Sequence, residues 1–90
     1  MTAPTDPALN TRFEAAVVRS RQLSERPDNM TLLQLYALFK QASEGDAADS
    51  EKPGAMDFVG MAKFNARVAL RGTTSAEAMQ KYIDLVDSLA

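Results

Sequence analysis

The sequence contains no cysteine and no histidine. Their absence excludes disulfides, thiolate catalysis, metal sites built from Cys and His, and every catalytic triad that uses His. Catalysis would then need a pair of carboxylates, an activated lysine or a Ser–Lys arrangement. No spacing of these residue types separates such a group from ordinary surface residues. We therefore expect a protein that is not an enzyme and that uses neither a metal nor a cofactor.

Long apolar runs are also absent, since no run approaches the ~20 residues of a membrane-spanning helix. Residues 1–7 have neither the basic nor the apolar part of a secretory signal. The net charge of −2 argues against non-specific binding of nucleic acid, because clustered basic charge supplies most of that affinity. We expect a cytoplasmic monomer that neither inserts into a membrane nor binds nucleic acid, although a few basic side chains could still converge on an anion.

Glycine and proline are scarce, with four of each, so long regular elements are expected between them. Four segments carry apolar residues at the 3.6-residue period, and strand-like alternation is absent. They predict helices from about Leu9 to Leu23, from Asp28 to Gly45, from Phe58 to Leu70, and from Thr74 onward. The fold class is therefore all-α, a four-helix bundle. We expect residues 1–9 to be a flexible leader and residues 10–90 to form one domain.

Three local signals support these boundaries. Asp28 is a good N-cap, and Gly45 is a natural helix stop. The segment Thr74–Glu77 has the Ser/Thr-x-x-Glu form of a capping box. On the third helix, Met61, Phe64 and Val68 are expected to point inward. The long connection 45–57 contains Pro53-Gly54, a strong turn signal.

The second predicted helix carries the pattern that points to a ligand. Tyr36 and Lys40 stand four residues apart on one face, with Phe39 beside them. A phenol, an ammonium group and an aromatic ring could together hold a phosphorylated ligand that contains a base. Taken alone, the same residues could equally form the end of an ordinary amphipathic helix, and the pattern leaves both interpretations open.

The whole chain resembles the acyl-CoA-binding protein family. The resemblance covers residues 10 to 89 and rests on these residues: Phe13, Leu23, Pro27, Tyr36, Phe39-Lys40-Gln41-Ala42, Gly45-Asp46, Pro53-Gly54, Asp57-Phe58, Gly60, Ala62-Lys63, Gly72-Thr73, Ala78-Met79 and Tyr82-Ile83. It implies an up-down-down-up topology in which the loop 45–57 joins two parallel helices. It also implies non-enzymatic binding, pooling and transport of medium- and long-chain fatty acyl-CoA thioesters.

The resemblance also assigns the residues that contact the CoA group. Tyr36, Lys40 and Lys63 would gather the ribose 3′-phosphate, and Tyr82 would approach the nucleotide. Phe39 would lie alongside them, and Arg21 is placed near the phosphates. The chain departs from the usual family pattern at four positions: Phe39 replaces a tyrosine, Phe64 a tryptophan, Arg67 an aromatic residue and Ser20 an apolar core residue.

The acyl tail of such a ligand needs shelter from water, because each buried methylene contributes about 0.8 kcal/mol before costs. Val17, Leu32 and Leu33 are the candidates for this groove. Long-chain acyl-CoA is the expected partner, with enzymes that use acyl-CoA as a further option. The rival interpretation is a helical protein-interaction module, whose exposed apolar groove would receive a partner helix.

Overall fold

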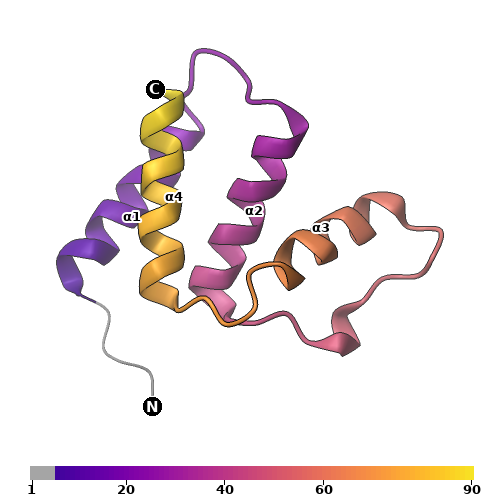
Figure 1. Cartoon of the computed structure of the whole chain (residues 1–90). Helices are drawn as coiled ribbons and strands as arrows, with labels where there is room; N and C mark the ends of the chain where they lie inside the picture. The colour runs from indigo at the N-terminus through magenta and orange to yellow at the C-terminus, as the bar shows by residue number, and fades with distance from the viewer. Residues whose placement is uncertain (1–5) are drawn as a thin grey trace.

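The computed structural model describes residues 6–90, which form four α-helices and one short 3-10 helix. The helices are α1 (Pro7–Ser20), α2 (Asn29–Glu44), α3 (Phe58–Val68) and α4 (Ser75–Leu89), and η1 (Asp49–Glu51) lies in the long loop. Figure 1 shows α1 and α4 side by side and pointing the same way, with α2 running in the opposite direction and α3 beyond it. Residues 6–90 contain no strand, and the predicted all-α, up-down-down-up fold is confirmed.

The first helix begins earlier than the sequence pattern suggested. The Asp6 carboxylate accepts a hydrogen bond from the Ala8 amide at 3.0 Å, and Pro7 is the first helical residue. Proline suits that position because its missing N–H would have had no partner there. Residues 7 and 8 are therefore part of α1, which starts two residues before its predicted start at Leu9. Residues 1–5 of the predicted leader lie outside the described part of the chain.

The same helix ends at Ser20, three residues before the predicted end at Leu23. The Ser20 hydroxyl donates to the Val17 carbonyl at 2.6 Å, and the Arg21 amide donates to the Val18 carbonyl at 3.1 Å. Hydrogen bonds between residues three apart tighten the last turn, and they occupy carbonyl groups that would otherwise accept the bonds of a continuing α-helix. The apolar period alone could not show this competition.

The boundaries of α2 and the start of α4 agree with the predicted caps. The Asp28 carboxylate accepts from the Thr31 amide at 2.7 Å, and Gly45 ends α2 with a φ of 79°, a conformation that favours glycine. At α4, the Thr74 hydroxyl accepts from the Glu77 amide at 3.1 Å, and the Glu77 carboxylate accepts from the Thr74 amide at the same distance. The capping box is thus complete.

The hydrophobic core lies among α1, α2 and α4, and α3 packs mainly against α2. Its buried residues are Phe13, Ala16, Leu35, Leu38, Ala42, Ala78, Tyr82, Ile83 and Val86. On α3, Met61, Phe64 and Val68 are only half-buried, contrary to the inward positions predicted for them. A helix with a single main neighbour cannot bury a wide apolar face. As a result, a cavity remains on each side of the contact between α2 and α3.

A buried amide ties the end of α2 to the turn before α4. Gln41 is 1% exposed, and its Nε2 donates to Asp46 Oδ1 at 2.7 Å and to the Thr73 carbonyl at 2.8 Å. Asp46 Oδ1 also accepts from the Gly72 amide at 2.9 Å. These bonds fix the two ends of the long segment that carries α3.

Replacing Asp46 with asparagine is expected to lower the melting temperature at neutral pH and to weaken its decline in acid. The bonds from Gln41 and Gly72 hold the pKa of Asp46 below its ordinary value of 3.8. Their contribution to stability is therefore complete above the unfolded pKa and is lost as the pH falls through the lower folded pKa. Thermal melts across pH 2 to 7, at roughly half-unit steps, measure this. Asp84→Asn, at an exposed carboxylate on α4, is the control, and an identical acid profile for both variants would contradict the assignment.

Candidate functional site

Tyr36 lies at the centre of the candidate site. It is half-buried on α2 and lines three adjoining cavities, one toward the start of α3, one toward the long loop, and one toward α1 and α4. Tyr36 therefore contributes to three cavities whose other lining residues differ in polarity and charge. Each predicted site residue except Lys40 lines at least one of these cavities.

The first cavity lies between α2 and the first half of α3 and has a volume of about 470 Å³. Its lining residues are Arg26, Asn29, Leu32, Leu33, Tyr36, Phe58, Val59, Ala62 and Lys63. The Lys63 ammonium lies 5.2 Å from the centroid of the Tyr36 ring, within the range of a cation–π interaction. The predicted pairing of a tyrosine and a lysine from separate helices is present, with apolar side chains next to it.

The second cavity, of about 240 Å³, lies where α1, α2 and α4 meet. Its lining residues are Val17, Ser20, Arg21, Leu32, Leu35, Tyr36, Phe39 and Tyr82. Phe39 is 37% exposed and stacks on Phe13, with ring centroids 5.9 Å apart, while Phe13 meets Tyr82 edge-on at 5.2 Å. Phe39 therefore presents a supported aromatic face without a hydroxyl.

Tyr82 is more deeply buried than a ligand-binding side chain usually is. It is 4% exposed and belongs to the core. Its hydroxyl donates to Ser20 Oγ at 3.0 Å, and Ser20 Oγ donates in turn to the Val17 carbonyl. Ser20 at a core position thus provides the hydrogen-bond acceptor that a buried phenol requires. Little of the Tyr82 side chain is therefore accessible to a ligand.

The third cavity, of about 200 Å³, contains a cation that the sequence pattern did not single out as a site residue. It is lined by Tyr36, Glu51, Pro53, Gly60, Lys63, Phe64 and Arg67. Arg67 is 5% exposed. Its guanidinium donates hydrogen bonds to Glu51 Oε1 at 2.8 Å and to the Gly45 carbonyl at 3.3 Å. Its buried Nε has no hydrogen-bond partner among residues 6–90. The sequence did carry a signal for this site residue, because Arg67 follows Lys63 by four residues and both cations therefore lie on one face of α3.

Lys40 is the one predicted site residue that lines none of these three cavities. Its ammonium donates to Glu44 Oε2 at 2.8 Å, and this bond, with the charge of Glu44, raises the pKa of Lys40 above its ordinary value. Glu44 Oε1 also lies 4.0 Å from Arg67 Nη2. Carboxylates therefore hold both Lys40 and Arg67 in this structure. The structure brings the other predicted residues together around Tyr36: Arg21, Val17, Leu32, Leu33, Phe39, Lys63 and Tyr82.

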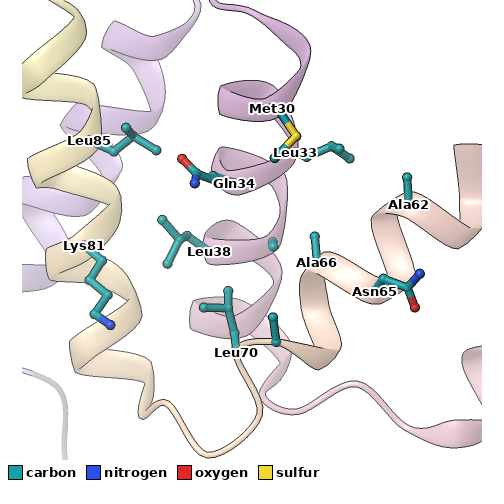
Figure 2. A pocket seen from close by; sticks show the side chains of 12 residues that line it. Met30, Leu33, Gln34, Leu38, Ala62, Asn65, Ala66, Leu70, Lys81 and Leu85 are labelled. Carbon is teal, nitrogen blue, oxygen red and sulfur yellow. The ribbon is translucent and has the colours of Figure 1, made fainter.

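A larger and almost entirely apolar cavity lies on the other side of the α2–α3 contact. Figure 2 shows it between α2, α3 and α4, and its volume is about 630 Å³. It is lined by Met30, Leu33, Gln34, Ala37, Leu38, Ala62, Asn65, Ala66, Ala69, Leu70, Lys81 and Leu85. Leu33 and Ala62 also line the first cavity. The two cavities therefore meet at these two side chains.

Residues 6–90 hold no cluster of three or more acidic side chains suited to binding a metal ion. Across the same residues, no helix combines the length and the hydropathy that a bilayer crossing requires.

Comparisons with known proteins agree with this arrangement. Residues 10–86 match the family model for acyl-CoA-binding protein. The chain is 44% identical to an acyl-CoA-binding protein homolog of Drosophila melanogaster, over 90% of this chain and 93% of that protein. It is 41% identical to the acyl-CoA-binding protein of Dictyostelium discoideum, over 89% and 94%. The crystal structure of Oryza sativa acyl-CoA-binding protein 2 superposes with a TM-score of 0.82 at 32% identity, over 90% of this chain and 89% of that one.

The same unit also occurs inside a larger protein. The chain is 42% identical to part of enoyl-CoA delta isomerase 2 of Rattus norvegicus, covering 97% of this chain but 22% of that protein. The match to the family model spans residues 10–86 and therefore includes every residue around Tyr36. The chain therefore belongs to the acyl-CoA-binding protein family.

Proposed function

We propose that this protein binds medium- and long-chain fatty acyl-CoA thioesters without altering them, and so pools and transports them. The observation that carries the proposal is the position of Tyr36, where an aromatic face, four cations (Arg21, Arg26, Lys63 and Arg67) and an apolar cavity adjoin. A CoA thioester has the matching parts, namely a base, phosphates and a hydrocarbon tail. Membership of a family of binding proteins supports binding rather than catalysis.

The phosphates of the ligand would meet Lys63 and Arg67 from α3 and Arg21 from the end of α1. Hydrogen bonds between charged groups contribute about 1.5–3 kcal/mol each. These cations concentrate positive charge that the whole molecule, at a net −2, does not have. The adenine would lie against Tyr36 and the exposed face of Phe39, with the edge of Tyr82 behind them.

Lys40 and Arg67 would join the site when a phosphate of the ligand replaces the carboxylates that they now contact. Glu44 and Glu51 hold them in this structure. Glu44 and Glu51 are both exposed, so water can solvate each carboxylate once a phosphate takes its place. We infer that the 3′-phosphate replaces these carboxylates, which would give Lys40 the role implied by the family resemblance although Lys40 lines none of the three cavities.

Titration calorimetry with free CoA and a series of CoA esters tests the proposal directly. Affinity is expected to rise with tail length, because the first cavity offers Leu32 and Leu33 to the methylenes next to the thioester. Free CoA, which lacks the tail, is expected to bind weakly. Equal affinity for free CoA and palmitoyl-CoA would contradict this mechanism.

The rival function, a module that binds a partner helix, gives a different thermal result. A ligand that binds only the native state raises the melting temperature. Palmitoyl-CoA should therefore stabilise this protein, and the absence of any shift at saturation would favour the rival. Action as a cytoplasmic monomer, and delivery to enzymes that use acyl-CoA, belong to the same proposal. Gel filtration, cell fractionation and pull-down with such enzymes are the measurements that check them.

A further inference from the structure

Arg67 is a buried cation whose charge depends on one carboxylate of the long loop. A guanidinium has five N–H donors, and a charge taken out of water needs an anion beside it. In this structure that anion is Glu51, whose Oε1 accepts from Arg67 Nη1 at 2.8 Å. Glu44 is farther away, with its Oε1 4.0 Å from Arg67 Nη2, and it does not line the cavity that Arg67 and Glu51 share. Glu51 is therefore the main counter-ion of Arg67.

The same carboxylate also closes the short turn that carries it. Glu51 Oε2 accepts from the Ala48 amide at 2.7 Å while Oε1 is bonded to Arg67. The Ala48 amide and the Arg67 guanidinium hold the pKa of Glu51 below its ordinary value of 4.5, so Glu51 is ionised at neutral pH. Because the two oxygens belong to one rigid planar group, Glu51 cannot turn away from Arg67 and keep its bond to Ala48 in the same geometry.

Arg71 holds the rest of this turn independently of Glu51. Its Nε donates to the Ala47 carbonyl and its Nη2 to Asp49 Oδ1. Neither bond involves the Glu51 carboxylate, so both can persist when that carboxylate moves away. Releasing Glu51 therefore breaks its two hydrogen bonds, one of them to Ala48, but does not unfold the loop.

The cavity beside Glu51 is the place where a phosphate would compete with it. Tyr36, Lys63 and Arg67 line this cavity together with Glu51. The Nε of Arg67 is buried and has no hydrogen-bond partner among residues 6–90, so the guanidinium has a donor that Glu51 leaves unused. A phosphate monoester carries up to about two negative charges and three strong acceptor oxygens. It can therefore bond to Arg67 and Lys63 at the same time.

We propose that Glu51 is an internal competitor of the 3′-phosphate, and that it limits how strongly the protein prefers esters that carry this phosphate. This inference rests on the proposed function. In the free protein Glu51 is bonded to Arg67, and in the complex the phosphate takes its place while the Ala48 amide loses its acceptor. An ester without the phosphate leaves Glu51 where it is and incurs no such cost. Glu51 thus weakens the binding of phosphate-bearing esters, which suits a carrier that must release them.

Glu51→Gln tests the competition because it keeps the size of the side chain but removes its charge. Affinity for palmitoyl-CoA should rise about three- to tenfold, since a bond from Arg67 to a neutral amide is weaker than one to a carboxylate. Affinity for the 3′-dephospho ester should stay within about twofold of wild type. The melting temperature of the ligand-free variant should fall, because Arg67 loses its counter-ion. Loss of a merely structural contact would lower stability without strengthening binding.

Asp49→Asn is the matched control. It removes one negative charge from the same turn, at a carboxylate that is 95% exposed and is bonded to Arg71. It should change the affinity for either ester by less than about twofold. An equal gain in both variants would assign the effect to the general charge of the loop and would overturn the proposal. An unchanged or lowered affinity of folded Glu51→Gln for palmitoyl-CoA would overturn it as well.

A measurement on the unaltered protein keeps the test decisive whatever the stability of the variants. The Ala48 amide donates to a carboxylate in the free protein, and such a charge-assisted bond shifts the NMR resonance of the amide proton downfield. Saturating palmitoyl-CoA should move this resonance upfield, whereas the 3′-dephospho ester should leave it in place. A resonance that palmitoyl-CoA does not move, or that both esters move equally, would contradict the release of Glu51.

The outcomes also separate this inference from the proposed function. If wild-type protein binds no ester of the series, the proposed function fails and Glu51 has no phosphate to compete with. If wild-type protein binds palmitoyl-CoA tightly but neither Glu51→Gln nor the Ala48 resonance responds as expected, the proposed function stands. In that case only the competition at Arg67 is lost.

Discussion

Tyr36→Ala is expected to weaken palmitoyl-CoA binding by a factor of about thirty to one thousand. Loss of an aromatic side chain at the centre of a binding surface costs about 2–4 kcal/mol, and each 1.4 kcal/mol is about tenfold in Kd. The loss should be large because Tyr36 lines all three cavities of the site and also holds Lys63 over its ring. Titration calorimetry with palmitoyl-CoA measures the change.

The matched control is Tyr36→Phe, which keeps the ring and the contact with Lys63 but removes the hydroxyl. It should retain most of the affinity, losing no more than about tenfold, which corresponds to a single hydrogen bond. Tyr36 is half-buried, so circular dichroism and a thermal melt must first show that both variants fold. A folded Tyr36→Ala protein with nearly wild-type affinity would show that the ligand lies elsewhere.

Arg67→Met is expected to weaken palmitoyl-CoA binding by about ten- to a hundredfold. The methionine preserves much of the buried volume but removes a cation whose hydrogen bond to a phosphate would contribute about 1.5–3 kcal/mol. If the partner is the 3′-phosphate, affinity for the 3′-dephospho ester should hardly change. The ratio of the two affinities is the decisive measurement, because a merely structural role for Arg67 would lower both equally.

A nearby arginine provides a close control for this variant. Arg71 also ties the long loop to the turn after α3, since it donates to the Ala47 carbonyl and to Asp49 Oδ1, both at 2.9 Å. It does not line any cavity of the site. Arg71→Met should therefore loosen the loop but leave the ratio between the two esters unchanged. If it lowered that ratio as strongly as Arg67→Met, the loop and not the guanidinium would be responsible.

The fold was predictable where local chemistry sets it. Asp28, Gly45 and the pair Thr74–Glu77 form their caps through hydrogen bonds within a few residues, so the sequence contains the whole signal. The start of α1 carried a similar signal in Asp6-Pro7, which the apolar period did not reveal. The end of α1 involves the Ser20 hydroxyl, which bonds locally to the Val17 carbonyl, whereas its bond from Tyr82 exists only once α4 is in place.

The site was predictable in its aromatic and apolar parts and less so in its charges. Tyr36, Phe39 and Lys63 have positions that follow from helical spacing and from the resemblance to a known family. Lys40 was expected beside them, but a carboxylate one turn away competes for its ammonium, and spacing alone cannot rank the two partners. Arg67 looked like a departure from the family pattern, and only the packed structure shows its guanidinium buried beside Tyr36 and Lys63.

The single main contact of α3 has a consequence for how a ligand enters and leaves. α1, α2 and α4 share the core, so separating any of them exposes much apolar surface. α3 buries little and is tethered at its two ends by loops, so it can swing away from α2 at a small cost in free energy. On the proposed function, a long tail would enter and leave by hinge motion of this one helix while the rest of the protein stays folded.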